Sequence, residues 1–225
     1  TSAYQVEGAA LEDGKGPSCQ DVKDIPAGTA DLSVSVDHYH HYKEDIALMA
    51  EMGFKSYRFS ISWSRVLPKG VGEVNPEGIA FYNDLINECL KYDIEPIVTM
   101  FHFDMPAALD ERGSWSTHES VDWFAEYARV LFENFGDRVK YWLTINEQNM
   151  LTLVGPVIGT LHIPEGTTNV TKKFTNKTIT NWLRKPKPCK FVTKCCLRLK
   201  LVLLQISHLF MRHHQNQKMF WQQKN

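Results

Sequence analysis

The 225-residue sequence lacks acidic residues over its last 60 positions. All 26 Asp and Glu residues lie between Glu7 and Glu165, whereas 13 of the 25 Lys and Arg residues lie between Lys172 and Lys224. The formal net charge of −1 therefore conceals an acidic first part and a basic last part. Such a change of composition within one chain indicates two segments that need separate interpretations.

The sequence also lacks the features of several protein classes. Its five cysteines are odd in number and form no C-x-x-C pair, which argues against a disulfide framework or a zinc site. No apolar run approaches the ~20 residues that a membrane span needs, and no secretion leader is recognisable. The cluster of His38, His40 and His41 matches no zinc spacing, so we expect it to be structural. We therefore expect a cytoplasmic protein without metal, cofactor or membrane association.

Helical and strand patterns alternate through the first 165 residues. One helical pattern ends at Gly53, and another begins at Asn75-Pro76. A third follows Ser116 and Glu119, which have capping-box spacing. Bounded apolar strand patterns cover residues 55–61, 95–103 and 139–147. This alternation predicts parallel strands joined by crossover helices, as in a doubly wound sheet or a (β/α)8 barrel.

Polar residues gather where the predicted strands end, and this favours the barrel. His102 and Asp104 end the second strand pattern, and Asn146 and Glu147 end the third. Barrel enzymes carry their chemistry at the carboxyl ends of the strands. The absence of G-x-G-x-x-G and G-x-x-x-x-G-K-[ST] motifs further weakens a nucleotide-binding interpretation.

Glu147 is the strongest catalytic candidate, because it directly follows an apolar strand. Aromatic walls around such a carboxyl would raise its pKa and make it a general acid, although a solvated surface Glu is an even alternative. Arg58, in the middle of a strand, would need a carboxylate partner inside the barrel. His102 could bind a substrate hydroxyl or be a core histidine. Three tryptophans could be sugar platforms or core residues: Trp63, Trp115 and Trp142.

Four motifs together resemble family-1 glycoside hydrolases, the β-glucosidase and 6-phospho-β-glucosidase family. They are TSAYQVEGA at residues 1–9, YRFSISWSR at 57–65, HFDMP at 102–106 and TINE at 144–147. The resemblance covers residues 1–172. It implies a (β/α)8 barrel that hydrolyses β-glycosides with retention by means of two glutamates.

The resemblance also implies roles for individual residues. Glu147 matches the general acid/base, and Arg58 matches the arginine that pairs with the nucleophilic glutamate. Gln5, His102 and Asn146 match residues that hydrogen-bond the sugar. No I/V-T-E-N-G motif, which carries the family's nucleophile, occurs in this chain. We therefore expect a truncated barrel with about four of eight strands, and a chain that is inactive by itself.

Two local substitutions indicate the branch of the family. Phe103-Asp104-Met105 stands where the family motif has W-D-L, and Gln148 stands where it has proline. Both resemble bacterial 6-phospho-β-glucosidases, so we expect 6-phospho-β-glucosides as substrates. An unphosphorylated β-glucoside and a non-catalytic carbohydrate-binding fragment are the alternatives.

Residues 173–225 resemble nothing in the family. A basic nucleic-acid arm would explain their charge but not their Leu-rich run, and Pro186 and Pro188 interrupt any membrane-surface helix. A shift of reading frame near Lys172 would remove the GAN codons of Asp and Glu, and so explains the missing acids. We therefore expect an out-of-frame, poorly ordered tail, with no nucleic-acid or membrane partner.

Overall fold

The computed structural model describes residues 1–147, all of which belong to one compact unit, Thr1–Lys185. The predictions for Gln148 and for residues 173–225 lie outside the described residues.

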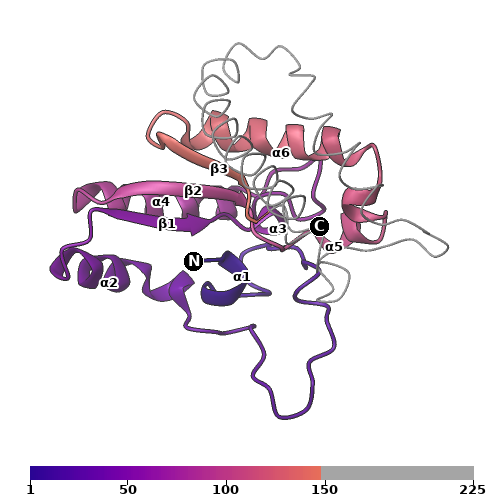
Figure 1. Cartoon of the computed structure of the whole chain (residues 1–225), viewed down its shortest axis with the longest axis horizontal. Coiled ribbons are helices and arrows are strands. Elements are labelled where there is room, and N and C mark those ends of the chain that lie inside the picture. Colours follow the sequence, from indigo (N-terminus) through magenta and orange to yellow (C-terminus); the bar gives the residue numbers. More distant parts are fainter. Residues whose placement is uncertain (148–225) are drawn as a thin grey trace, which may run out of the picture. The chain divides into compact units, whose positions relative to one another are not determined.

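A three-stranded parallel sheet is the centre of this unit (Figure 1). Its strands are β1 (Ser56–Ser60), β2 (Glu95–Phe101) and β3 (Tyr141–Ile145), in that spatial order. Arg58 is level with Ile97, which is in turn level with Tyr141. The prediction of parallel strands is confirmed. The expected number of about four strands is not reached within residues 1–147, where the sheet has three.

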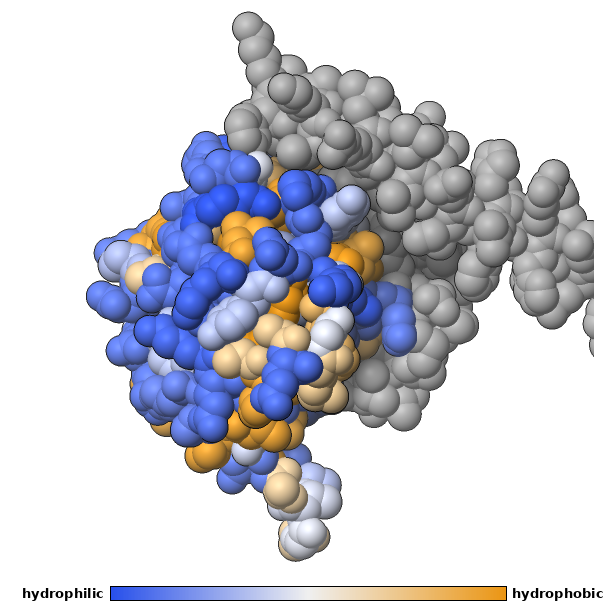
Figure 2. Space-filling model, turned by 90° about the vertical axis from the view of Figure 1, so that its left-hand side faces the viewer, coloured by the Kyte–Doolittle hydropathy of each residue, from blue (hydrophilic) through white to orange (hydrophobic). Residues whose placement is uncertain are grey.

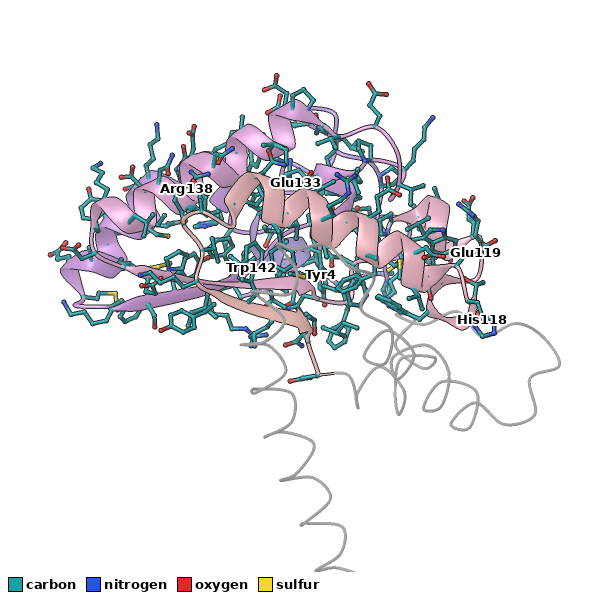
Figure 3. All side chains as sticks on the ribbon, turned by 90° about the horizontal axis from the view of Figure 1, so that it is seen from above. Tyr4, His118, Glu119, Glu133, Arg138 and Trp142 are labelled. Atoms are coloured by element: carbon teal, nitrogen blue, oxygen red, sulfur yellow. The ribbon has the colours of Figure 1, made fainter. Side chains whose placement is uncertain are left out.

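Three long helices cover one face of the sheet; the first precedes β1, and the other two connect β1 to β2 and β2 to β3. They are α2 (His38–Glu51), α4 (Pro76–Lys91) and α6 (Ser120–Phe135). Figure 3 shows α4 and α6 side by side over the sheet, and Arg138 bonds Asn83 and Asn87 of α4 from the end of α6. The covered face therefore holds the core, as in a β/α crossover layer.

The two sheet faces differ in burial. Tyr57, Val98 and Trp142 lie on the face under the helices and are buried. Arg58 and Tyr141 lie on the opposite face and are exposed. In a closed barrel this second face would line the interior, and three strands cannot close.

Local sequence signals predict the start of α4 correctly and the start of α6 wrongly. Asn75 caps α4 by accepting a hydrogen bond from the Glu77 amide at 3.3 Å, and Pro76 occupies the first position, as predicted. The capping box at Ser116 and Glu119 is wrong. The Ser116 hydroxyl bonds the Gly113 carbonyl instead, and α6 begins at Ser120.

Four short helical segments were not foreseen. They are α1 (Ala3–Val6), α3 (Trp63–Val66), α5 (Ala107–Asp110) and the 3-10 helix η1 (Ser114–Ser116). The start of the chain, with α1, contacts β1: the Thr1 amino group donates to the Arg58 carbonyl at 2.8 Å, and the Ala3 amide donates to Ser60 Oγ at 2.7 Å.

An aromatic cluster fills the space between α6 and the sheet. The Trp63 ring stacks on Tyr127 with 4.6 Å between centroids. The Tyr127 hydroxyl donates to the Ile61 and Met100 carbonyls at 3.1 and 3.0 Å, and thereby links the ends of β1 and β2. Trp63, Trp115 and Trp142 are all buried, so they are core residues and not sugar platforms.

A buried ion pair holds the N-terminal segment against α3 and α4. Arg65 is 0% exposed, and its Nε donates to Glu7 Oε2 at 3.2 Å. The Tyr82 hydroxyl donates to the other Glu7 oxygen at 2.6 Å. Because both charges are removed from water, the pair requires these partners.

The remaining surface is mixed. Figure 2 shows apolar side chains among a mostly hydrophilic surface, and Met52 and Tyr141 are among the exposed large apolar residues. The described residues contain no helix long and apolar enough to cross a membrane.

His38 bonds Asp45, and His40 bonds Asp37 and Glu12, so these histidines have structural partners.

Candidate active site

Three segments bring the predicted site residues to the carboxyl ends of the strands. Helix α1 carries Gln5, the turn after β2 carries His102, and the end of β3 carries Asn146 and Glu147. The backbone amide of Asn146 donates to the Phe101 carbonyl at 2.9 Å, which extends the pairing of β2 and β3 beyond the end of β3. The predicted location at the strand ends is therefore observed for these turns.

Arg58 and Asn146 form the centre of the site. The Arg58 guanidinium donates to Asn146 Oδ1 at 2.6 Å and, through Nε, to Thr99 Oγ1 at 3.0 Å. One arginine thus joins all three strands. The expected carboxylate partner is not found among residues 1–147, where the partners of Arg58 are an amide and a hydroxyl.

His102 is a neutral imidazole at the edge of the site. Its pKa is lowered to about 4, first by burial and then by the positive charges of Arg58 and the amino terminus. Its Nδ1 atom is buried and has no hydrogen-bond partner. A neutral imidazole can donate from one nitrogen and accept at the other, which suits binding of a hydroxyl group.

Asp104 lies behind His102 and is buried, with 1% of its surface exposed. One of its carboxyl oxygens accepts a hydrogen bond from the His102 amide at 3.3 Å, and the other has no partner. Burial raises the pKa of Asp104 to about 8. The carboxyl is therefore mainly protonated at neutral pH, a property that no short-range sequence pattern indicates.

Glu147 and Gln5 are both exposed. The aromatic walls that were expected to desolvate Glu147 are not supplied by residues 1–147. Its backbone has φ of 42°, a left-handed conformation that turns the chain sharply after Asn146. The Gln5 side chain accepts from the Ser2 hydroxyl. Within the described part of the chain, neither side chain bonds Arg58, Asn146 or His102.

Sequence reasoning missed the segment at residues 17–20, which contacts the turn that carries His102. Cys19 and Gln20 both bond the Phe103 carbonyl, more than 80 positions away in the sequence. No motif or periodicity relates these positions, so only the folded chain reveals the contact.

The fold and the site together define a layer of three parallel strands and crossover helices, with polar groups at the carboxyl ends of the strands. The chain belongs to glycosyl hydrolase family 1, whose model matches residues 1–182. This assignment confirms the resemblance found in the sequence. The match extends to residue 182, so the prediction that the resemblance ends at residue 172 is wrong by ten residues.

Individual relatives support the assignment. The chain is 54% identical over 154 residues to aryl-phospho-β-D-glucosidase BglC of Bacillus subtilis, covering 66% of this chain and 32% of the relative. It is 54% identical over 158 residues to β-glucosidase 11 of Arabidopsis thaliana, covering 69% and 30%. It thus spans about a third of the length of these relatives.

Solved structures of β-glucosidases also resemble this chain. A family-1 β-glucosidase from Thermotoga maritima matches with a TM-score of 0.71 and 45% identity, over 82% of this chain and 42% of that chain. The rice β-glucosidase Os3BGlu6 matches with a TM-score of 0.68 and 45% identity, over 71% and 34%.

Proposed function

We propose that this chain is the acid/base half of a retaining β-glycosidase. In this proposal Glu147 protonates the leaving group and later activates water, while a carboxylate about 5–5.5 Å away, supplied by a further segment, is the nucleophile. The observation that carries the proposal is the Arg58–Asn146 hydrogen bond, one residue before Glu147. It fixes a cation and an amide at the end of β3, at the residue next to Glu147 in the sequence.

The neighbouring residues have defined roles in this proposal. Gln5, His102 and Asn146 hydrogen-bond the hydroxyls of a single sugar. Asn146 holds the 2-hydroxyl, where a hydrogen bond strengthens as the oxocarbenium-like transition state forms. Arg58, whose charge is not balanced by a carboxylate within residues 1–147, keeps the incoming nucleophile ionised.

For the substrate we propose 6-phospho-β-glucosides, used in the cytoplasm without any cofactor. The support is the FDM sequence at residues 103–105, Gln148, and the similarity to BglC. The alternative is an unphosphorylated β-glucoside, which the similarity to the Thermotoga and plant β-glucosidases favours. A non-catalytic carbohydrate-binding fragment is the alternative outside enzymes.

A chimera tests the proposed catalytic role. Residues 1–147 replace the matching segment of β-glucosidase A from Thermotoga maritima, to which the chain is 48% identical over 168 residues. We expect hydrolysis of alkyl β-glucosides, whose poor leaving groups need protonation, and we expect it to be lost on Glu147→Gln. The matched control is Glu133→Gln, because Glu133 lies on exposed α6 in a surface pair with Arg129. Equal activity of the two variants would contradict the proposal.

A second chimera, in which residues 1–148 replace the matching segment of BglC, tests the substrate. We expect a higher kcat/KM for p-nitrophenyl β-glucoside 6-phosphate than for p-nitrophenyl β-glucoside. Phe103→Trp together with Gln148→Pro should reduce this preference. An unchanged preference would remove these two residues as support for the phosphorylated substrate.

For residues 183–225, which lie beyond the family match, we propose an out-of-frame origin. The nucleotide sequence from codon 171 to the codons downstream of codon 225 tests this directly. A single-base shift that restores family sequence in the second frame is expected. A reading frame that remains unrelated to the family in every register would contradict it.

A further inference from the structure

The turn after β2 has an unfavourable backbone conformation. Phe103, between His102 and Asp104, has φ of 69° although it is not glycine. A bulky residue in the left-handed region is strained and persists only where its surroundings hold it. Something outside the turn must therefore stabilise the conformation that aims His102.

Residues 17–20 supply this support through backbone contacts. The Cys19 amide donates to the Met105 carbonyl at 2.7 Å, and the Ala107 amide donates to the Pro17 carbonyl at 2.9 Å. Ser18 and Pro106 form an isolated antiparallel bridge between these two contacts. Residues 17–19 thus run antiparallel beside residues 105–107, which directly follow the turn.

Gln20 contacts the strained residue itself through its side-chain amide. Its Nε2 donates to the Phe103 carbonyl at 2.6 Å, and the Cys19 thiol contacts the same oxygen at 3.5 Å. Lys23 Nζ donates to Gln20 Oε1 at 3.0 Å. The amide is therefore fixed at both ends, with its oxygen toward the ammonium and its nitrogen toward Phe103.

The segment that carries Gln20 is itself braced. Asp21 accepts hydrogen bonds from the Ser18 amide and hydroxyl and from Lys15 Nζ, all at 2.7 Å. These contacts fix the loop from which Gln20 reaches the turn. The position of the Gln20 amide is thus determined by the loop and not by the turn alone.

We propose that Gln20 is a positioning residue for His102: it holds the strained Phe103 peptide, so that the half-buried imidazole keeps its orientation in the sugar site. The functional part of this statement rests on the proposed function, because it takes His102 to contact the sugar. The mechanical part concerns only the folded chain and can be tested without activity.

The experiment measures the pKa of His102 by NMR titration in the 225-residue protein, with the resonance assigned through His102→Gln. Gln20→Met keeps the length of the side chain and removes the donor. Gln20→Lys keeps a donor. Thr29→Ala is the matched control, because Thr29 lies further along the same loop and bonds only the nearby Pro26 carbonyl.

In Gln20→Met the turn relaxes and the imidazole gains water, so the His102 pKa should rise from about 4 toward its ordinary value of 6.5. We expect a rise of about one pH unit or more. Gln20→Lys and Thr29→Ala should leave the value low. An unchanged value in Gln20→Met would overturn the proposal, as would an equal rise in all three variants.

The titration also separates this proposal from the proposed function. A shifted His102 pKa in Gln20→Met supports the positioning role even if the chimeras hydrolyse no glycoside. If Gln20→Met unfolds, Gln20→Leu is titrated instead. It is neutral and removes the donor, so the same rise is expected, and its absence overturns the proposal.

Discussion

The guanidinium of Arg58 donates a hydrogen bond to Asn146 Oδ1 at 2.6 Å, across 88 positions of sequence. The bond connects the outer strands of the sheet over the middle one, where Thr99 receives the second bond from the same arginine. It places a positive charge beside two groups of the candidate site, Asn146 and His102. The predictions below begin with that charge.

Replacement of Arg58 should change the protonation of His102. The Arg58 charge is one of the causes that lower the His102 pKa. Arg58→Gln should therefore raise this pKa, by less than about one pH unit because Arg58 is exposed and solvent screens its charge. Arg58→Lys keeps the charge and should leave the value low. NMR titration of His102 provides the measurement, and a rise in both variants would show that geometry, not charge, is responsible.

Glu147→Gln should slow the chimera in a way that depends on the leaving group. Substrates with poor leaving groups need protonation and should lose activity severely, by ~10²–10⁴-fold. Activated aryl glycosides need less protonation and should lose less in the glycosylation step. Pre-steady-state rates for both substrate types distinguish the cases. Equal losses for the two would argue against Glu147 as the acid.

The 225-residue chain itself should not turn over β-glucosides. It contains no I/V-T-E-N-G motif to supply the nucleophile, and loss of one member of a catalytic unit costs several orders of magnitude. The purified chain is incubated with aryl β-glucosides, with and without a 6-phosphate. Hydrolysis above that of a Glu147→Gln chain would contradict the expectation.

Glu7→Gln should destabilise the fold strongly. It leaves the Arg65 charge, which is 0% exposed, without its counter-charge, and such losses typically cost ~3–5 kcal/mol. The free energy of unfolding in urea provides the measurement. Glu133→Gln, in an exposed pair, is the control and should change stability far less. Similar losses of unfolding free energy in both variants would show that the buried pair stabilises the fold no more than the exposed pair.

Asp104 should make the folded protein less stable as the pH rises. Burial raises the pKa of Asp104 to about 8 in the folded state, whereas the unfolded value is 3.8. Between these values the folded state binds the extra proton, so the free energy of unfolding falls with increasing pH. His102 acts in the opposite sense, because its pKa is lowered and the unfolded state binds the extra proton between pH 4 and 6.5.

The two residues can be separated by pH. From pH 6.5 to 8 only Asp104 changes its contribution, so the parent should lose stability there and Asp104→Asn should lose less. Between pH 6.5 and 4 the contributions of Asp104 and His102 oppose each other, so acidification should favour the folded state more in His102→Gln than in the parent. Urea denaturation at a series of pH values provides both measurements. A parallel pH dependence in Asp104→Asn and the parent would show that the carboxyl is ionised throughout.

The sequence by itself determined the order of the elements and the end of the sheet where the site lies. Helical and strand periodicities are local, and the Asn75-Pro76 start of α4 depends on neighbouring residues only. Parallel strands then place His102 and Asn146 at the same edge, because all carboxyl ends point the same way. Four separated motifs were enough to indicate the family that the comparison confirmed.

Only the tertiary structure decided what each polar side chain contacts. No sequence pattern indicates that Arg58 bonds Asn146 and Thr99 or that Trp63 stacks on Tyr127 in the core. The contact from Gln20 to Phe103 spans 83 positions. Sequence patterns report the period of an element and therefore which face a residue occupies. Partners and pKa values depend on distance and burial in space, which are set only when segments far apart in the chain pack together.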